Sequence, residues 1–210
     1  MSTFLLVDQD IKFNTKLNGT YLPFGKKGGC MAREEVWGRG GNTRWLSMLD
    51  SKVDGLRNVN GPAAISMGSI TVDRQSTVIF GESNWKSYEL RFGLQIMEGA
   101  NAQIQLRRSD DGKQCYMVDF LFGWQALGVS RINHRPGGKG LQKLSVVNLE
   151  MSRLAEFKVE IAVRELSITT YVDGKLINQV TDDAFDAGPM AFCAWEAKAR
   201  FDQPEYRVLG

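Results

Sequence analysis

YELRFGLQIM, residues 88–97, alternates apolar and polar side chains and decides the fold. A period of two indicates a β-strand with one buried face, because successive side chains point to opposite sides of a sheet. The apolar face carries Leu90, Phe92, Leu94 and Ile96, and the polar face carries Glu89, Arg91 and Gln95. The stretch therefore predicts a half-buried strand and not a helix.

The residues that follow repeat this pattern and add a turn. In AQIQLRR, residues 102–108, Ile104 and Leu106 alternate with polar side chains. The sequence SDDG comes next, at 109–112, and Asp and Gly supply the backbone angles that a tight hairpin turn requires. Residues 114–122 are therefore expected to form the returning strand of a β-hairpin.

Later parts of the chain show the same alternation. Strands are expected over 155–166, 167–172, 175–180, 190–197 and 206–209, with a hairpin turn at Asp173-Gly174. No window of about 12 residues carries the apolar stripe of a helix. The sequence predicts an all-β protein, a two-sheet antiparallel β-sandwich of about a dozen strands. We expect one domain over residues 1–210.

The composition is that of an ordinary folded domain. Of the 210 residues, 43% are apolar, and 26 Lys and Arg balance 24 Asp and Glu to a net charge of +2. This apolar content excludes a disordered chain. The small net charge argues against a nucleic-acid partner. The basic clusters at Lys26-Lys27, Arg107-Arg108 and residues 131–143 are interpreted as solvated loops.

The N-terminus and the cysteines indicate where the protein is expected to act. The first residues, MSTFLLVDQDIKF, lack a basic segment, and the apolar run FLLV ends at Asp8, too short for a signal peptide or a membrane span. Cys30, Cys115 and Cys193 are widely spaced and odd in number, which favours free thiols over disulfides or a zinc site. We therefore expect a soluble protein, cytoplasmic or part of an assembled particle, with no membrane partner.

Residues 21–61 depart from the regular pattern. The segments KKGGC, WGRGGNTRW and VDGLRNVNGP are rich in Gly, Asn and Arg and contain Trp37 and Trp45. Neither GxxxxGKS/T nor GxGxxG occurs there, so nothing indicates a phosphate-binding loop. We interpret this Gly-rich region as irregular loops between strands.

From Trp85 onward the predicted strands follow one another in a set order. They read WKSYELRF, AQIQLRR, QCYMVDF, EFKVEIAVRELSITTYVDGKLI, GPMAFCAW and ARFDQPEYRVL. This order resembles the concanavalin A-like lectin/glucanase superfamily, nearest to its 3-keto-disaccharide hydrolase and laminin-G-like domains. The resemblance covers residues 85–209 and implies a jelly roll, the concanavalin A-like form of the sandwich. It rests on strand and turn patterns, so it implies a fold and no particular activity.

The catalytic motifs of related enzymes are missing. The glucanase branch carries an ExDxxE strand with its nucleophile and acid/base, and this sequence has no match to it. Glu34 and Glu35 would point to opposite faces of a strand, and Asp182-Asp183 is expected in a turn. The nucleophile motif GxSxG is also absent, so His134, the single histidine, is interpreted as a solvated loop residue. These absences favour binding over catalysis, although the hydrolase-like branch stays open because its catalytic groups have no residue-by-residue match here.

A polar row on the predicted hairpin is the candidate ligand-binding site. Because Ile104 and Leu106 are expected to face the core, the polar side chains between them should face away from it together. The candidate residues are Gln103, Gln105, Arg107, Tyr116 and Asp119, with Trp124 as a stacking surface. Such a row can hydrogen-bond sugar hydroxyls, although a sheet face that contacts only solvent shows the same pattern. Arg107→Ala is accordingly expected to abolish binding with little change in stability.

Asp202, in ARFDQPEY, is the candidate metal ligand. It matches the Asp of the closing-strand motif, and the resemblance implies that this region helps to bind a structural calcium ion. The neighbouring Trp195-Glu196 is interpreted as a core or rim aromatic residue next to an exposed charge. No other cofactor is expected.

Three functions fit the sequence. The first is a non-catalytic glycan-binding module, with carbohydrate as its partner. The second is a structural or assembly protein of a phage or cellular particle, in which the partners are further copies or other subunits. The third is a hydrolase-like enzyme that acts on a disaccharide-like substrate.

Overall fold

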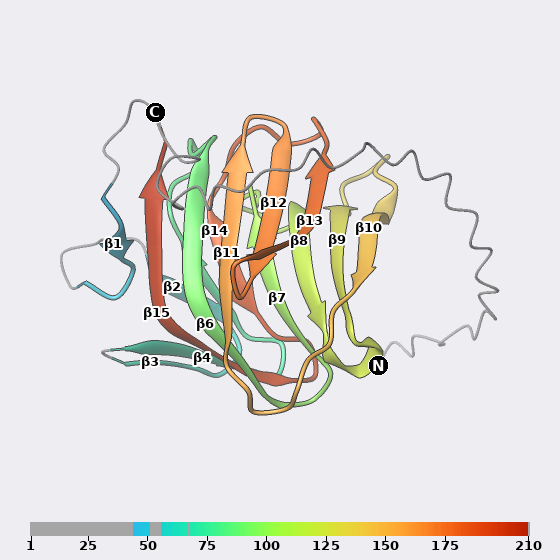
Figure 1. The fold of residues 1–210 in the computed structure, drawn as a ribbon. Helices are drawn as coiled ribbons and strands as arrows, with labels where there is room; N and C mark the ends of the chain where they lie inside the picture. Colours follow the sequence, from blue (N-terminus) through green and yellow to red (C-terminus); the bar gives the residue numbers. More distant parts are fainter. Residues whose placement is uncertain (1–43, 51–55, 67, 210) are drawn as a thin grey trace, which may run out of the picture. The chain divides into compact units, whose positions relative to one another are not determined.

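The computed structural model describes residues 44–50, 56–66 and 68–209, which belong to one unit, Gly38–Gly210. Two antiparallel sheets form its layers, with the eight-stranded sheet in front in Figure 1. The predicted β-sandwich is therefore confirmed. The described residues contain one helix, the 3-10 turn η1 (Phe122–Trp124), and none that is long and apolar enough to cross a membrane. The N-terminal stretch, Cys30, Lys26-Lys27, Glu34-Glu35 and most of the Gly-rich region lie outside the described residues.

The eight-stranded sheet has the order β13-β12-β11-β6-β15-β4-β3, and β1 pairs with β15. Its strands are β1 (Leu46–Ser47), β3 (Ala63–Ile65), β4 (Ser69–Asp73), β6 (Tyr88–Glu98), β11 (Phe157–Arg164), β12 (Ser167–Val172), β13 (Lys175–Thr181) and β15 (Lys198–Val208). The long strand β6 lies between β11 and β15 at the centre of this sheet.

The seven-stranded sheet has the order β10-β9-β8-β7-β14-β5-β2. Its strands are β2 (Arg57–Asn60), β5 (Thr77–Phe80), β7 (Asn101–Leu106), β8 (Gln114–Leu121), β9 (Ala126–Asn133), β10 (Gly140–Asn148) and β14 (Met190–Cys193). The predicted hairpin is its central part, since β7 pairs with β8 on one side and with β14 on the other.

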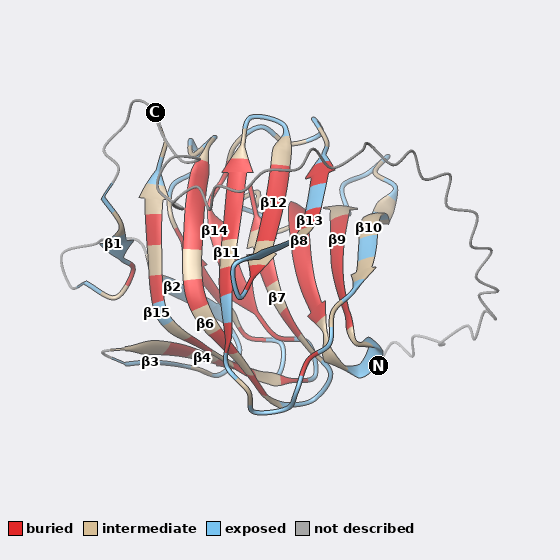
Figure 2. Ribbon diagram, in the orientation of Figure 1, coloured by how far each residue is buried: buried red, intermediate tan, exposed pale blue. Residues whose placement is uncertain are grey.

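The core lies between the two sheets, as Figure 2 shows by the buried positions along the strands. Leu90, Leu94, Ile104 and Leu106 are all fully buried, so the alternation in β6 and β7 is confirmed. Aromatic rings from both sheets meet here, with the Phe192 and Phe201 centroids 4.5 Å apart. These contacts fix which face of each strand points outward and can reach a ligand.

Three parts of the sandwich differ from the sequence-based expectation, and the first is the strand expected over 190–197, which ends at Cys193. Residues 131–143 are not all loop, because β9 continues to Asn133 and β10 begins at Gly140. The closing strand β15 begins at Lys198 and not at Tyr206, with a bulge between Asp202 and Glu205. That bulge interrupts the alternation, which is the signal from which the strand would have been recognised.

Candidate functional site

Polar side chains lie on the outer face of the seven-stranded sheet, the side that points away from the core. The register places Gln103 of β7 opposite Asp119 of β8, and Asp119 opposite Gly128 of β9. The next row along the same strands holds Gln105, Met117 and Ser130. Two aligned rows on three adjacent strands thus form the centre of this outer face.

Asp119 is the charged group at this centre, and it is only 8% exposed. Gln103 Nε2 donates to Asp119 Oδ2 at 3.3 Å, whereas Asp119 Oδ1 has no hydrogen-bond partner in the described part of the chain. Burial raises the pKa of Asp119 to about 6, against a smaller opposing effect of the Gln103 hydrogen bond. A desolvated carboxylate oxygen without a donor carries an energetic cost that an incoming hydroxyl group would relieve.

The residue opposite Asp119 on the neighbouring strand has no side chain. Gly128 lies directly opposite on β9, and a Cβ added there would meet no atom closer than Leu121 Cδ1, at 3.6 Å. That distance is an ordinary van der Waals contact, so packing does not require a glycine. A larger side chain at Gly128 would instead occupy space next to the carboxylate.

The polar face continues from Gln105 toward the β7–β8 hairpin turn. Arg108 Nε donates to Gln105 Oε1 at 2.9 Å, and Arg108 Nη1 donates to the Ser109 carbonyl at 3.1 Å. Arg108 and Arg135 line a depression of about 320 Å³ beside this turn. Arg135 in turn lies 3.4 Å from the Asp111 carboxylate. The basic groups at this end are therefore partly neutralised.

Trp124 lies at the other end of the outer face, in η1, and is 72% exposed. The turn is tied to the start of β7, because the Gly123 N–H donates to the Ala100 carbonyl at 3.3 Å. Lys143 of β10 places its Nζ 5.7 Å from the centroid of the Trp124 ring. Since Lys143 pairs with Ser130 of the outer face, the indole lies on the same side of the sheet.

Arg107 does not belong to this face, and its predicted exposure is wrong. The residue is 2% exposed, and its side chain donates to the carbonyls of Lys86, Glu165 and Phe185. Strand β7 ends at Leu106, and Arg107 has a φ of 49°. Alternation holds only while the backbone stays extended, so the left-handed residue after the strand turns its side chain into the interior.

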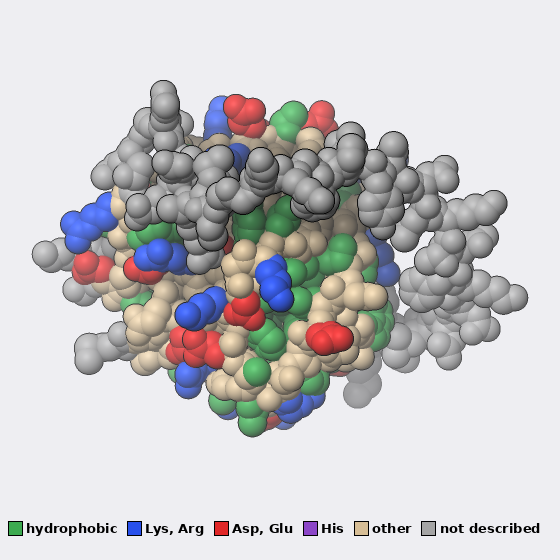
Figure 3. All heavy atoms as spheres, viewed as in Figure 1, with side chains coloured by type: hydrophobic (Ala, Val, Ile, Leu, Met, Phe, Trp, Pro, Cys, Tyr) green, Lys and Arg blue, Asp and Glu red, His purple; other side chains and the backbone are tan. Residues whose placement is uncertain are grey.

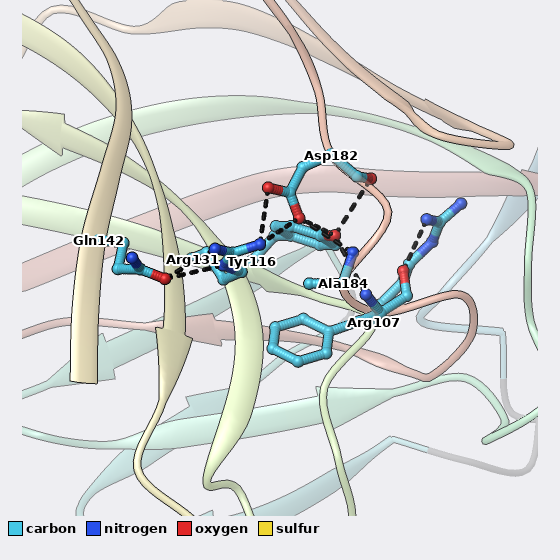
Figure 4. Close-up of polar contacts among 7 residues, drawn as sticks. Arg107, Tyr116, Arg131, Gln142, Asp182 and Ala184 are labelled. Carbon is cyan, nitrogen blue, oxygen red and sulfur yellow. Dashed lines mark hydrogen bonds and ion pairs between the residues drawn. The ribbon is translucent and has the colours of Figure 1, made fainter. Parts of the chain in front are cut away.

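Tyr116 is also misplaced by the sequence-based prediction. It is paired with Leu106 and fully buried between the sheets, where its Oη donates to Asp182 Oδ1 at 2.7 Å. Arg131 Nη1 donates to both carboxylate oxygens of Asp182, at 3.0 and 2.9 Å, and Arg131 Nη2 donates to Gln142. Figure 4 shows that this network converges on Asp182. It stabilises the sandwich, and Asp182 is not an exposed turn residue.

Asp202 has a partner of its own in the structure. Arg200 Nε donates to Asp202 Oδ2 at 2.7 Å. The described residues contain no group of three or more His, Cys, Asp or Glu that could hold a metal ion, and calcium binding at Asp202 stays a prediction. His134 is exposed in the loop after β9, as expected. Cys115 and Cys193 are buried free thiols in two strands, also as expected.

The outer face of the eight-stranded sheet is highly charged, and Figure 3 shows acidic and basic side chains interspersed on it. The buried Glu89 accepts hydrogen bonds from Arg164 and Arg207. The Trp45 ring lies 4.4 Å from the Arg91 guanidinium and 4.6 Å from that of Arg207. A depression of about 340 Å³ between β6, β11 and β15 is lined by both signs of charge. Glu89 is thus paired with two guanidinium groups, and in the described part of the chain Asp119 is the one carboxylate with a buried oxygen that lacks a partner.

Three residues of the candidate site were missed in the sequence. Gly128 and Ser130 of β9 and Lys143 of β10 lie on the same side as Asp119. The alternation of Leu127 and Val129 with small residues in ALGVSRIN would have revealed β9. Residues 131–143 were instead expected to be loop, because basic residues lie on both sides of His134.

The fold is that of the concanavalin A-like jelly-roll sandwiches. No protein-family model matches the chain, and no curated protein matches it either. Among solved structures, the chain is similar to the carbohydrate-binding module CBM66 from Bacillus subtilis, at 15% identity and a TM-score of 0.61, over 73% of this chain and 97% of that one. At such an identity the likeness shows the fold alone.

Two further solved structures share the fold. A β-glucanase from Bacillus licheniformis is 12% identical, with a TM-score of 0.57 over 82% of this chain and 100% of that one. The Crh5 transglycosylase in complex with NAG is 13% identical, with a TM-score of 0.54 over 79% of this chain and 83% of that one. None of these three structures is named as a structural or assembly protein, so they give that alternative no support.

Proposed function

We propose that this protein is a non-catalytic glycan-binding module that binds its ligand on the outer face of the seven-stranded sheet. The observation that carries the proposal is Asp119, a buried carboxylate with one oxygen unpaired and the Gln103 amide beside it. Neighbouring hydroxyl groups of a sugar ring both donate and accept hydrogen bonds. They match a carboxylate oxygen and an adjacent amide, and the exposed Trp124 adds a surface for stacking.

The similar structures support a carbohydrate as the ligand. They are a carbohydrate-binding module, a β-glucanase and a transglycosylase in complex with NAG. Because the sequence identities are low, we use these proteins to choose which ligands to test first. The choice of residues rests on the geometry of Asp119.

The carboxylate count favours binding without cleavage. Asp119 is the only Asp or Glu in the seven described strands of this sheet. A retaining glycosidase needs two carboxyl groups about 5 Å apart, and an inverting one needs them about 6.5–9.5 Å apart. A single carboxylate can accept hydrogen bonds from a sugar but cannot supply both roles.

The test is a glycan array followed by calorimetric titration of each hit with the wild type and Asp119→Asn. We expect at least one hit, and a loss of about tenfold or more in its affinity for Asp119→Asn, because the amide replaces a charged acceptor. Lys158→Ala, in the depression on the eight-stranded sheet, is the matched control and should bind as the wild type does. If only the Lys158 variant loses binding, the ligand binds to the eight-stranded sheet instead. Hydrolysis of the hit by the wild type would contradict the non-catalytic part of the proposal.

A further inference from the structure

A second exposed tryptophan, Trp195, lies just beyond the end of β14 and is 55% exposed. Cys193, two residues earlier, pairs with Gln103 and packs outside the main core, whereas Ala194 belongs to the core. Trp195 itself lies in the bend after β14, so its place comes from its contact with Asn101, which shares the outward parity of Gln103 in β7. The Trp195 N–H donates to Asn101 Oδ1 at 3.2 Å, which fixes the turn against the start of β7.

The turns that carry Trp124 and Trp195 contact the same short segment. Gly123 donates to the Ala100 carbonyl, and Trp195 donates to the side chain of Asn101. Both turns thus border the end of the outer face at which β7 begins, and each carries an exposed tryptophan. The row next to this end contains Gln103 and Asp119.

The spacing of the strands sets the distance between the two turns that carry the tryptophans. Strand β7 lies between β14 and β8, so two inter-strand steps, about 10 Å in total, separate the strands that precede the two turns. The Nζ of Lys143, from the edge strand β10 beyond β8, lies 5.7 Å from the centroid of the Trp124 ring. This span exceeds one sugar ring, and the hydrogen-bonded pair Gln103–Asp119 lies within it.

We infer that the site binds an internal stretch of a linear glycan that crosses the strands, with Trp195 and Trp124 stacking on two different sugar units. The unit between them hydrogen-bonds to Asp119 and Gln103. This inference rests on the proposed function and adds the ligand class, a chain of several linked units. It also adds Trp195 as a binding residue. An isolated exposed tryptophan would need no explanation, but here two of them lie near a buried carboxylate with one unpaired oxygen.

The test compares ligand lengths. Mono- to hexasaccharides of β-1,3-linked glucose, β-1,4-linked glucose and β-1,4-linked N-acetylglucosamine are titrated into the wild type, Trp195→Ala and Leu176→Ala. We expect the wild-type affinity to rise from one unit to at least three. Trp195→Ala should lower the hexasaccharide affinity about tenfold and flatten the dependence on length. Leu176→Ala removes an equally exposed apolar side chain from the eight-stranded sheet and should change neither property.

A spectroscopic readout covers the case in which Trp195→Ala folds poorly. Hexasaccharide binding should shift the tryptophan fluorescence of the wild type, and Trp195→Phe should keep the binding but reduce that shift to the part that Trp124 contributes. A hexasaccharide that binds the wild type no better than the monosaccharide overturns the inference. Unchanged affinity in Trp195→Ala overturns it as well, and in both cases the proposed function stands. If no probe of any length binds, the proposed function fails for these glycans and the inference fails with it.

Discussion

Arg107 and Tyr88 join the two sheets of the sandwich, because the backbone N–H of Arg107 donates to Tyr88 Oη at 3.0 Å. Tyr88 begins β6 of one sheet, and Arg107 follows β7 of the other. Burial raises the pKa of Tyr88 far above its usual value, so the hydroxyl group stays neutral. The guanidinium of Arg107 meanwhile donates to carbonyls of three separate segments. One residue therefore links both sheets and the loops at one end of the sandwich.

Arg107→Ala should consequently destabilise the protein instead of weakening ligand binding. Its removal leaves three carbonyls without their donor, and we expect a loss of about 3 kcal/mol or more in the free energy of unfolding. Chemical denaturation measures this loss, with Lys158→Ala, at an exposed position on the outer face of β11, as the control, expected within about 0.5 kcal/mol of the wild type. If the Arg107→Ala protein is stable but no longer binds glycan, Arg107 contacts the ligand and the structural role assigned to it here is wrong.

The sequence predicts the strands wherever alternation is uninterrupted, but it does not predict how they end. Leu106 and Gln105 were assigned to the correct faces, whereas Arg107 was not, because its left-handed φ cannot be read from its neighbours. Tyr116 could have been placed correctly, since it shares its parity with Val118 and Phe120, which are both core residues.

Within the candidate site, residue types were easier to predict than partners. Asp119 and Trp124 are recognisable as a carboxylate and an exposed aromatic residue near a turn. That Asp119 lies opposite Gly128 depends on the β8–β9 register, which follows only once β9 is recognised as a strand. The proposed role of Trp195 depends on the pairing of β14 with β7, two strands that are distant in sequence.

The Asp182 network should contribute stability that is lost in acid. Burial alone would raise the pKa of Asp182, but hydrogen bonds from Tyr116 and Ala184 and the charge of Arg131 together lower it. A lowered carboxyl pKa stabilises the folded state above the usual value and ceases to do so as the pH falls through the folded value. We expect Asp182→Asn to cost about 1–3 kcal/mol at pH 7.

The deficit of Asp182→Asn should shrink as the pH falls below the usual carboxyl range, which denaturation curves at several pH values will show. Tyr116→Phe removes one hydrogen bond without changing the charge and should cost about 1 kcal/mol. The Tyr116 deficit should depend less on pH than that of Asp182→Asn. Equal deficits for Asp182→Asn at every pH would contradict the assigned pKa shift.

Asp119 should have the opposite effect on stability. Its pKa is raised to about 6, so the folded state holds the proton more tightly than the unfolded state does. The resulting destabilisation is absent below the unfolded value of about 4 and develops as the pH rises toward 6. Asp119→Asn should therefore be more stable than the wild type at pH 7, by about 1–3 kcal/mol. The two proteins should converge near pH 4, and calorimetric unfolding at both pH values measures this difference.

Glycan binding should depend on the same ionisation. An ionised Asp119 accepts hydroxyl hydrogen bonds more strongly than a protonated one, so the wild-type affinity should fall as the pH drops below about 6. Titration of the best hit between pH 4.5 and 7.5 measures this change. Asp119→Asn should show weak binding that does not vary over this range. If the wild-type affinity is constant between pH 4.5 and 7.5, Asp119 does not contact the ligand.

Gly128→Val should block the site without unfolding the sheet. Gly128 lies opposite Asp119, and its backbone requires no left-handed conformation, so an added Cβ makes only ordinary contacts. Valine also suits a strand, and we expect a change in the free energy of unfolding of no more than about 1 kcal/mol. Its two methyl groups would occupy the space beside the carboxylate, where the sugar hydroxyl must approach Asp119 Oδ1. The glycan affinity should therefore fall by about tenfold or more.

Gly128→Ala is the matched control, because its single methyl group fits and should leave most of the affinity. If the valine variant is as stable as the wild type and binds equally well, the ligand does not approach Asp119 from the side of β9.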